Sequence, residues 1–210
     1  MKKILLLGLA MMALVEAKAQ TNQYLSFGPV AGLGGSSVAN LNGDSRFMPS
    51  GYLGVGAIYS RYVHWGWGAQ LVVSSEGYKM QDPAGNIVTA DPMYLRLPLR
   101  AYYFFGNYNS VVRPKIYLGP SLGLKLSEID NISNDNGRDL YMTENRNNFR
   151  TFDLGVNAGA GVNIKLAKAT WLNLDLGYYQ GLLDAVKDPA GNYNTNQNLV
   201  VSGGVLFGIR

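Results

Sequence analysis

The chain has no cysteine and a single histidine, His64. The lack of cysteine excludes disulfides, thiolate metal ligands and attachment of a lipid to an N-terminal cysteine. A metal site built from several histidines is excluded as well. Charged residues make up only 15% of the chain, and no phosphate-binding glycine loop is present. We therefore expect no metal, no cofactor and no enzymatic activity.

Residues 1–19 have the layout of a secretion signal. Met1-Lys2-Lys3 is basic, Ile4–Val15 is apolar, and Ala17-Lys18-Ala19 fits the rule for signal cleavage. The apolar run is shorter than the roughly 20 residues of a membrane-spanning helix. We expect cleavage before Gln20, leaving residues 20–210 as one exported domain. The net charge of +4 is small, and export also argues against nucleic acid as a partner.

Apolar and polar residues alternate along most of the remaining chain. The clearest stretch is Thr151–Leu166, where every second residue from Phe152 onward is apolar. This period of two predicts a strand with one apolar and one polar face. Its length exceeds the roughly 5–6 residues usual for a soluble strand and suits a tilted strand that crosses a bilayer.

The same alternation recurs in segments separated by long and short connections in turn. An even number of strands with this rhythm is typical of outer-membrane barrels. The sequence therefore predicts an all-β fold, an eight-stranded antiparallel up-and-down transmembrane β-barrel. Both termini should lie at the periplasmic, short-turn end. The expected strands are Leu25–Ser37, Ser50–Val63, Trp65–Lys79, Pro92–Phe105, Pro114–Ser127, Thr151–Leu166, Thr170–Leu182 and Asn198–Ile209.

Parity alone does not say which face of the barrel points inward. A soluble periplasmic barrel that binds an apolar ligand would place the apolar face inside. Glycines such as Gly155, Gly159 and Gly161 share the polar face, whereas the bulky residues share the apolar face. A small barrel has little room inside, so we expect the polar face in the lumen and the apolar face against outer-membrane lipid.

Charged residues on the polar face then need partners, because an unpaired buried charge costs several kcal/mol. We expect a network of ion pairs and hydrogen bonds that fills the lumen, centred on Arg96 and Arg100, rather than a lumen that conducts ions. Besides Glu76, its predicted members are Arg96, Arg100, Lys115, Lys125, Asp153, Lys165 and Asp175.

Aromatic residues gather beside the expected short turns. Such side chains favour the lipid–water boundary, where the ring is buried and its polar tip is hydrated. The sequence therefore predicts an interfacial aromatic girdle at the periplasmic end. Its members are Trp65, Trp67, Tyr103, Phe105 and Trp171.

Three segments carry a resemblance to a known family. Tyr94-Leu95-Arg96-Leu97-Pro98-Leu99, Tyr117-Leu118-Gly119-Pro120-Ser121-Leu122-Gly123 and the glycine-rich Phe27–Gly34 resemble strands of the PorT-like outer-membrane β-barrel family of the Bacteroidetes. The resemblance implies an eight-stranded outer-membrane barrel, whose founding member is associated with type IX secretion. Pro98 and Pro120 fall within strands, where each removes a ladder donor, and we expect β-bulges there.

The long connections are the expected seat of any specific function, above all 128–150. They could bind another envelope protein or a surface glycan. Asp82–Asn86 and Asp188–Asn192 repeat the sequence Asp-Pro-Ala-Gly-Asn, which favours a turn at a hairpin tip. A lipid A-modifying barrel enzyme is an alternative, but His64 is expected in a periplasmic turn, far from the outer leaflet.

Overall fold

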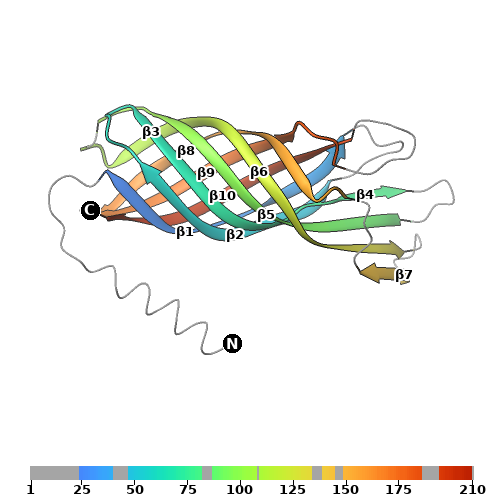
Figure 1. Cartoon of the computed structure of the whole chain (residues 1–210). Coiled ribbons are helices and arrows are strands. Elements are labelled where there is room, and N and C mark those ends of the chain that lie inside the picture. Colours follow the sequence, from blue (N-terminus) through green and yellow to red (C-terminus); the bar gives the residue numbers. More distant parts are fainter. Residues whose placement is uncertain are drawn as a thin grey trace.

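The computed structural model describes residues 24–39, 47–81, 87–107, 109–133, 139–144, 149–185 and 194–209 (Figure 1). These residues form long antiparallel strands, as their alternation predicts. No helix in these ranges is long and apolar enough to cross a bilayer. The strands are β1 (Leu25–Ala39), β2 (Met48–Tyr59), β3 (Trp65–Ser75), β4 (Tyr78–Gln81), β5 (Ile87–Phe104), β6 (Val112–Ser133), β7 (Asp139–Glu144), β8 (Phe152–Ala167), β9 (Thr170–Gly181) and β10 (Thr195–Ile209).

Neighbouring strands pair into one closed sheet. Its order is β4-β5-β3-β2-β1-β10-β9-β8-β6-β7, and the β5–β6 pairing closes the ring. β4 pairs with the same strand as β3 and continues it after a break at Glu76 and Gly77. β7 pairs only with the distal part of β6. The other eight strands form a closed antiparallel barrel, which confirms the expected fold class.

All eight expected strands form, but several ends differ by a few residues: Ser50–Val63 ends at Tyr59, and Trp65–Lys79 is divided into β3 and β4. The largest differences lie around 128–150 and before Pro92. β5 begins at Ile87, β6 continues to Ser133, and β7 lies within a segment expected to be loop. Figure 1 shows β4 and β7 at the end of the barrel opposite the C-terminus. The β5–β6 ladder continues past the barrel, from Met93↔Ser127 to Ile87↔Ser133. Residues 82–86 and 188–192, the expected hairpin tips, lie outside the described residues.

The expectation of bulges at Pro98 and Pro120 is wrong. The β5–β6 register is the same at Pro98↔Ser121 and at Ala101↔Leu118, and it shifts instead between Met93 and Tyr94. The side-chain amide of Asn157 donates to the carbonyl oxygens of Gly119 and Pro120, at 2.7 and 3.1 Å. Neither ladder of β6 shifts its register at Pro120, so the strand carries this proline without an inserted residue.

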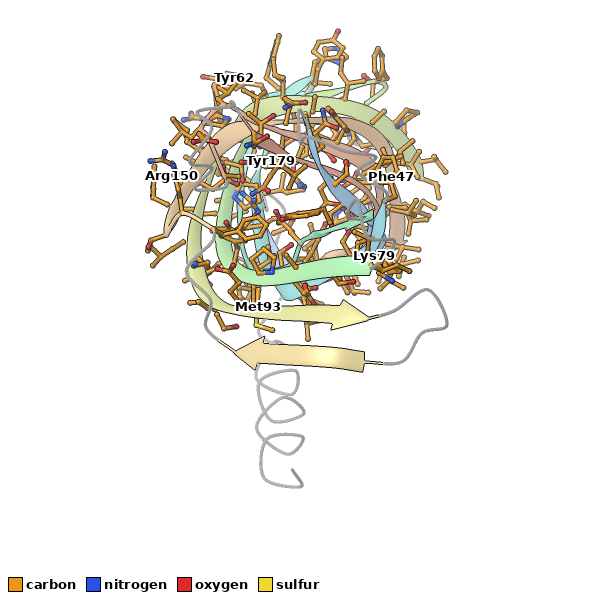
Figure 2. The ribbon with its side chains drawn as sticks, turned by 90° about the vertical axis from the view of Figure 1, so that its right-hand side faces the viewer. Phe47, Tyr62, Lys79, Met93, Arg150 and Tyr179 are labelled. Carbon is orange, nitrogen blue, oxygen red and sulfur yellow. The ribbon has the colours of Figure 1, made fainter. Side chains whose placement is uncertain are left out.

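The barrel is polar inside and apolar outside, as expected. Asp153 and Asn157 on β8 are buried, whereas Leu118 on the adjacent β6 is 59% exposed. Looking toward the end that carries the long connections, Figure 2 shows Tyr179 within the ring of strands. The alternative of a soluble barrel with an apolar interior is therefore wrong, because the pleat turns the bulky residues outward.

Two apolar clusters fill the ends of the lumen. One lies toward the short turns, and the other toward the long connections. A polar interior with one small cavity among the described residues separates them. The first cluster consists of Val30, Ile58, Val72, Tyr102, Phe104, Tyr117 and Leu206, and the second of Val38, Tyr78, Ala90, Phe149 and Ala185.

Candidate functional site

The polar interior begins with an arginine held between two carboxylates. Arg96 on β5 donates through Nε and Nη2 to both carboxylate oxygens of Glu76, which sits at the break between β3 and β4. Its Nη2 also lies 2.7 Å from Asp153 Oδ2 on β8. All three side chains are buried. The group therefore joins strands on opposite sides of the β5–β6 closure.

Neutral side chains complete this cluster. Asp153 Oδ2 accepts from Tyr179 Oη at 3.0 Å and from Asn196 Nδ2 at 2.9 Å. The Arg96 guanidinium carbon lies 4.1 Å from the centroid of the Tyr179 ring, a favourable cation–π geometry. Ser74 Oγ donates to Glu76 at 2.7 Å. Buried charges are tolerated when their remaining hydrogen-bonding groups find such partners.

A second charged cluster lies nearer the short turns. Lys115 Nζ on β6 lies 2.9 Å from Asp175 Oδ1 on β9. It also donates to Asn163 Oδ1 at 2.8 Å and to Asn173 Oδ1. Asn173 Nδ2 in turn donates to Asp175 Oδ2 at 2.7 Å. The three donors of the ammonium group are thereby used within the barrel.

Arg100 lies between these two clusters in the lumen, and its environment differs from theirs. Its Nε donates to Asn157 Oδ1 at 2.9 Å, and its guanidinium carbon lies 4.4 Å from the centroid of the Tyr117 ring. A Cβ built on Gly177 would lie 2.5 Å from Tyr117 Oη, and a Cβ on Gly159 would also collide with it. Two of the glycines on the polar face therefore make room for a large lumenal side chain.

The end of the barrel near the long connections is closed by a charged tether. Lys125 Nζ lies 2.6 Å from Glu128 Oε2 and donates to the Phe149 carbonyl oxygen at 2.7 Å. The Phe149 amide donates to the same Glu128 oxygen at 3.2 Å. The Phe149 ring, fully buried, packs 5.9 Å from the Tyr78 ring. The chain before β8 is thus held to β6 by Lys125 and Glu128.

The structure pairs four of the seven charged residues expected in the network, Arg96 with Asp153 and Lys115 with Asp175. Lys125 and Arg100 bond other lumenal groups, Glu128 and Asn157 respectively. Lys165 is the exception: it is half-buried, and its Nζ lies 5.8 Å from the Trp171 ring centroid. Sequence reasoning missed Glu128 and Arg113, because it placed both in connections; Arg113 is buried, and its Nη2 donates to the Val63 carbonyl oxygen at 2.6 Å. It also missed Asn163 and Asn173, although both lie on the polar face by parity.

The aromatic residues expected as a girdle point outward near the short turns. Trp65 and Trp67 are exposed. The Tyr103 ring lies 5.2 Å from that of Trp65 and 5.1 Å from that of Phe105, edge to face in both pairs. Trp171 lies beside Lys165 on the neighbouring strand. Their position at a lipid–water boundary stays a prediction.

Neither candidate for nucleophilic chemistry lies in a suitable setting. Gly119–Gly123 fits the Gly-x-Ser-x-Gly pattern, which sequence reasoning overlooked, but Ser121 is buried in the middle of β6 rather than on a strand-to-helix turn. His64 lies in the short turn before β3, where its Nδ1 is 2.9 Å from the Phe104 carbonyl oxygen. Its ring stacks on Tyr103, with centroids 5.7 Å apart.

Comparison with known proteins extends this description. The family model described as "Outer membrane protein beta-barrel domain" matches residues 18–187. The outer membrane protein OprG of Pseudomonas aeruginosa is 15% identical, with a TM-score of 0.57, over 89% of this chain and 95% of that one. Neisserial surface protein A is 16% identical, with a TM-score of 0.50, over 90% of this chain and 100% of that one. No curated protein matches the sequence.

Proposed function

The chain belongs to the outer membrane protein beta-barrel domain family and is a small outer-membrane β-barrel protein; within that family we propose a non-enzymatic binding role, carried by the end with the long connections. The barrel serves as a rigid support in outer-membrane lipid. The chemistry of recognition belongs to the segment 128–150 and its neighbours.

One observation carries this proposal: among the described residues, the sheet continues past the barrel on the side of β5, β6 and β7. We call this projection the ledge; it comprises 87–93 of β5, 127–133 of β6 and β7. Its strands are paired from Ile87↔Ser133 to Met93↔Ser127, and β7 pairs with β6 from Ile129 to Ser133. A paired ledge presents its backbone at lower entropic cost than a loose loop, as binding surfaces on rigid scaffolds do.

The filled lumen supports the same assignment. The side chains of two apolar clusters and the Lys125–Glu128 tether occupy the barrel at its ends. Eight strands leave an interior only wide enough for side chains. We therefore place function on the ledge rather than in an ion-conducting pore. The purified protein in a planar bilayer should show no steady conductance.

The partner we propose is another envelope protein or a surface glycan. The resemblance of Tyr94–Leu99 and Tyr117–Gly123 to PorT-like barrels of the Bacteroidetes favours a protein partner. An accessory role in type IX secretion is the specific form that this resemblance suggests.

Photo-crosslinking in intact cells tests the proposal. A crosslinking amino acid replaces Tyr141 on β7, and the matched control replaces Ser110 in the short turn between β5 and β6. We expect a crosslinked product of defined mass from position 141 alone. The variant with the crosslinking amino acid at position 141 should keep the heat-modifiable gel mobility of a folded barrel. Equal crosslinking from both positions would contradict the proposal.

A further inference from the structure

A small cavity lies inside the barrel beside Arg100. It has a volume of about 60 Å³, room for a few water-sized species. Its lining comes from several strands around the ring and combines apolar side chains with hydroxyl, amide and guanidinium groups. The lining includes Tyr52, Gln70, Arg100, Ser121, Asn198 and Ser202.

Arg100 brings a positive charge to this cavity, and no carboxylate in the described part of the chain forms an ion pair with it. The residue is 8% exposed, and its Nη1 has no hydrogen-bond partner among the residues that the structure describes. The other guanidinium lining the cavity, that of Arg96, bonds Glu76 and Asp153. Glu76 also lines the cavity, but Arg96 and Ser74 occupy its oxygens. A buried cation without a counter-charge is costly.

The rest of the lining suits an anion. The hydroxyls of Tyr52, Ser121 and Ser202 are neutral groups that can each donate one hydrogen bond. Gln70 Oε1, which also lacks a partner among the described residues, would accept from a water beside the ion. We propose that the cavity holds one small inorganic anion of the halide class against the guanidinium of Arg100.

The two apolar clusters lie on either side of the polar interior, toward the short turns and toward the long connections. An anion held by Arg100 between them acts as a structural counter-ion of the lumen. This role is separate from the binding function of the ledge.

Refolding in different salts tests the proposal. The full chain is refolded in detergent micelles in sodium chloride or in sodium gluconate, each at ~0.15 M, so that screening is equal. With chloride at about ten times its dissociation constant, linkage raises the melting temperature by about 3–6 °C. The difference between salts should vanish in Arg100→Gln and persist in Lys165→Gln, whose cation lies away from the cavity. Equal melting temperatures of the native chain in both salts would overturn the proposal.

A second measurement does not depend on any variant folding. Crystals of the native chain refolded in sodium bromide should give an anomalous peak within hydrogen-bond reach of Arg100 Nη1. The absence of a peak there, or a peak only at the protein surface, would mean an adventitious ion and would also overturn the proposal.

Discussion

Lys115 Nζ lies 2.9 Å from Asp175 Oδ1, and both side chains are completely buried in the lumen. Removing one partner of such a pair leaves an uncompensated charge and costs about 3–5 kcal/mol. We expect Lys115→Met and Asp175→Asn each to lower the free energy of unfolding by this amount. Denaturant titration of the barrel in lipid vesicles, followed by tryptophan fluorescence, measures it.

The double variant provides the internal control for this pair. Because each single variant leaves the other group as an unpaired buried charge, the two losses in the free energy of unfolding should not add. Lys165→Met should cost about 1 kcal/mol or less, since Lys165 is half-buried and bonds no buried carboxylate among the described residues. Additive losses would mean that Lys115 and Asp175 act independently.

Gly177 leaves room for the Tyr117 hydroxyl group, so loss of that hydroxyl should offset the cost of a larger residue at position 177. A Cβ on Gly177 would meet Tyr117 Oη at 2.5 Å, with the next atom of that ring at 3.7 Å. Gly177→Ala should therefore destabilise the barrel by about 1–3 kcal/mol, and adding Tyr117→Phe should restore most of the loss. Thermal unfolding in micelles reads both effects.

Gly159 is the matched case in which rescue should fail. A Cβ there would collide with the Leu176 backbone carbonyl oxygen as well as with Tyr117. Tyr117→Phe removes the hydroxyl but leaves ring carbon Cζ 2.5 Å from this Cβ, with the Leu176 carbonyl oxygen closer still, so Gly159→Ala should stay destabilised in either background. Equal rescue at both glycines would contradict the packing described here.

A charged substitution on the outward face should destabilise the barrel most near its middle. Leu118 is 59% exposed on β6, and an arginine near the midplane of a transmembrane barrel costs about 2–4 kcal/mol. We expect Leu118→Arg to reduce the folded fraction in the outer membrane. Val111→Arg, in the short turn before β6, should cost about 0–1 kcal/mol. Heat-modifiable mobility of membrane fractions compares the two, and similar losses would argue against a lipid-facing Leu118.

His64 should be dispensable for lipid chemistry. Since a carbonyl oxygen only accepts, His64 Nδ1 donates its proton to the Phe104 carbonyl oxygen. The imidazole ring therefore stabilises the short turn. We expect His64→Ala to leave the lipid A profile unchanged in mass spectra of isolated outer membranes. A changed profile would restore the enzymatic alternative.

The mature protein should begin at Gln20. The Ala17-Lys18-Ala19 sequence fits signal cleavage. N-terminal sequencing of the protein extracted from outer membranes checks the site. Intact residues 1–19 in that fraction would show that the segment is retained.

Much of the fold could be read from the sequence, because alternation is a local property. Thr151–Leu166 was expected as a strand, and β8 spans Phe152–Ala167. The ledge was harder to predict from the sequence, because the polar residues in 128–150 resemble a loop. β7 forms there through its pairing with β6. The bulge expected at Pro120 was wrong because the ladders on both sides of β6 keep their register there, and that register is set by strands distant in sequence.

The sequence by itself determined the period of the strands, the even rhythm of their connections and the set of charges that share a face. Those features depend on neighbours in the chain, because side chains alternate across every strand. The tertiary structure alone decided which charges meet. Arg96 and Asp153 are 57 residues apart in the sequence. They face each other only because the ring closes through β5 and β6, and no local sequence pattern encodes that closure.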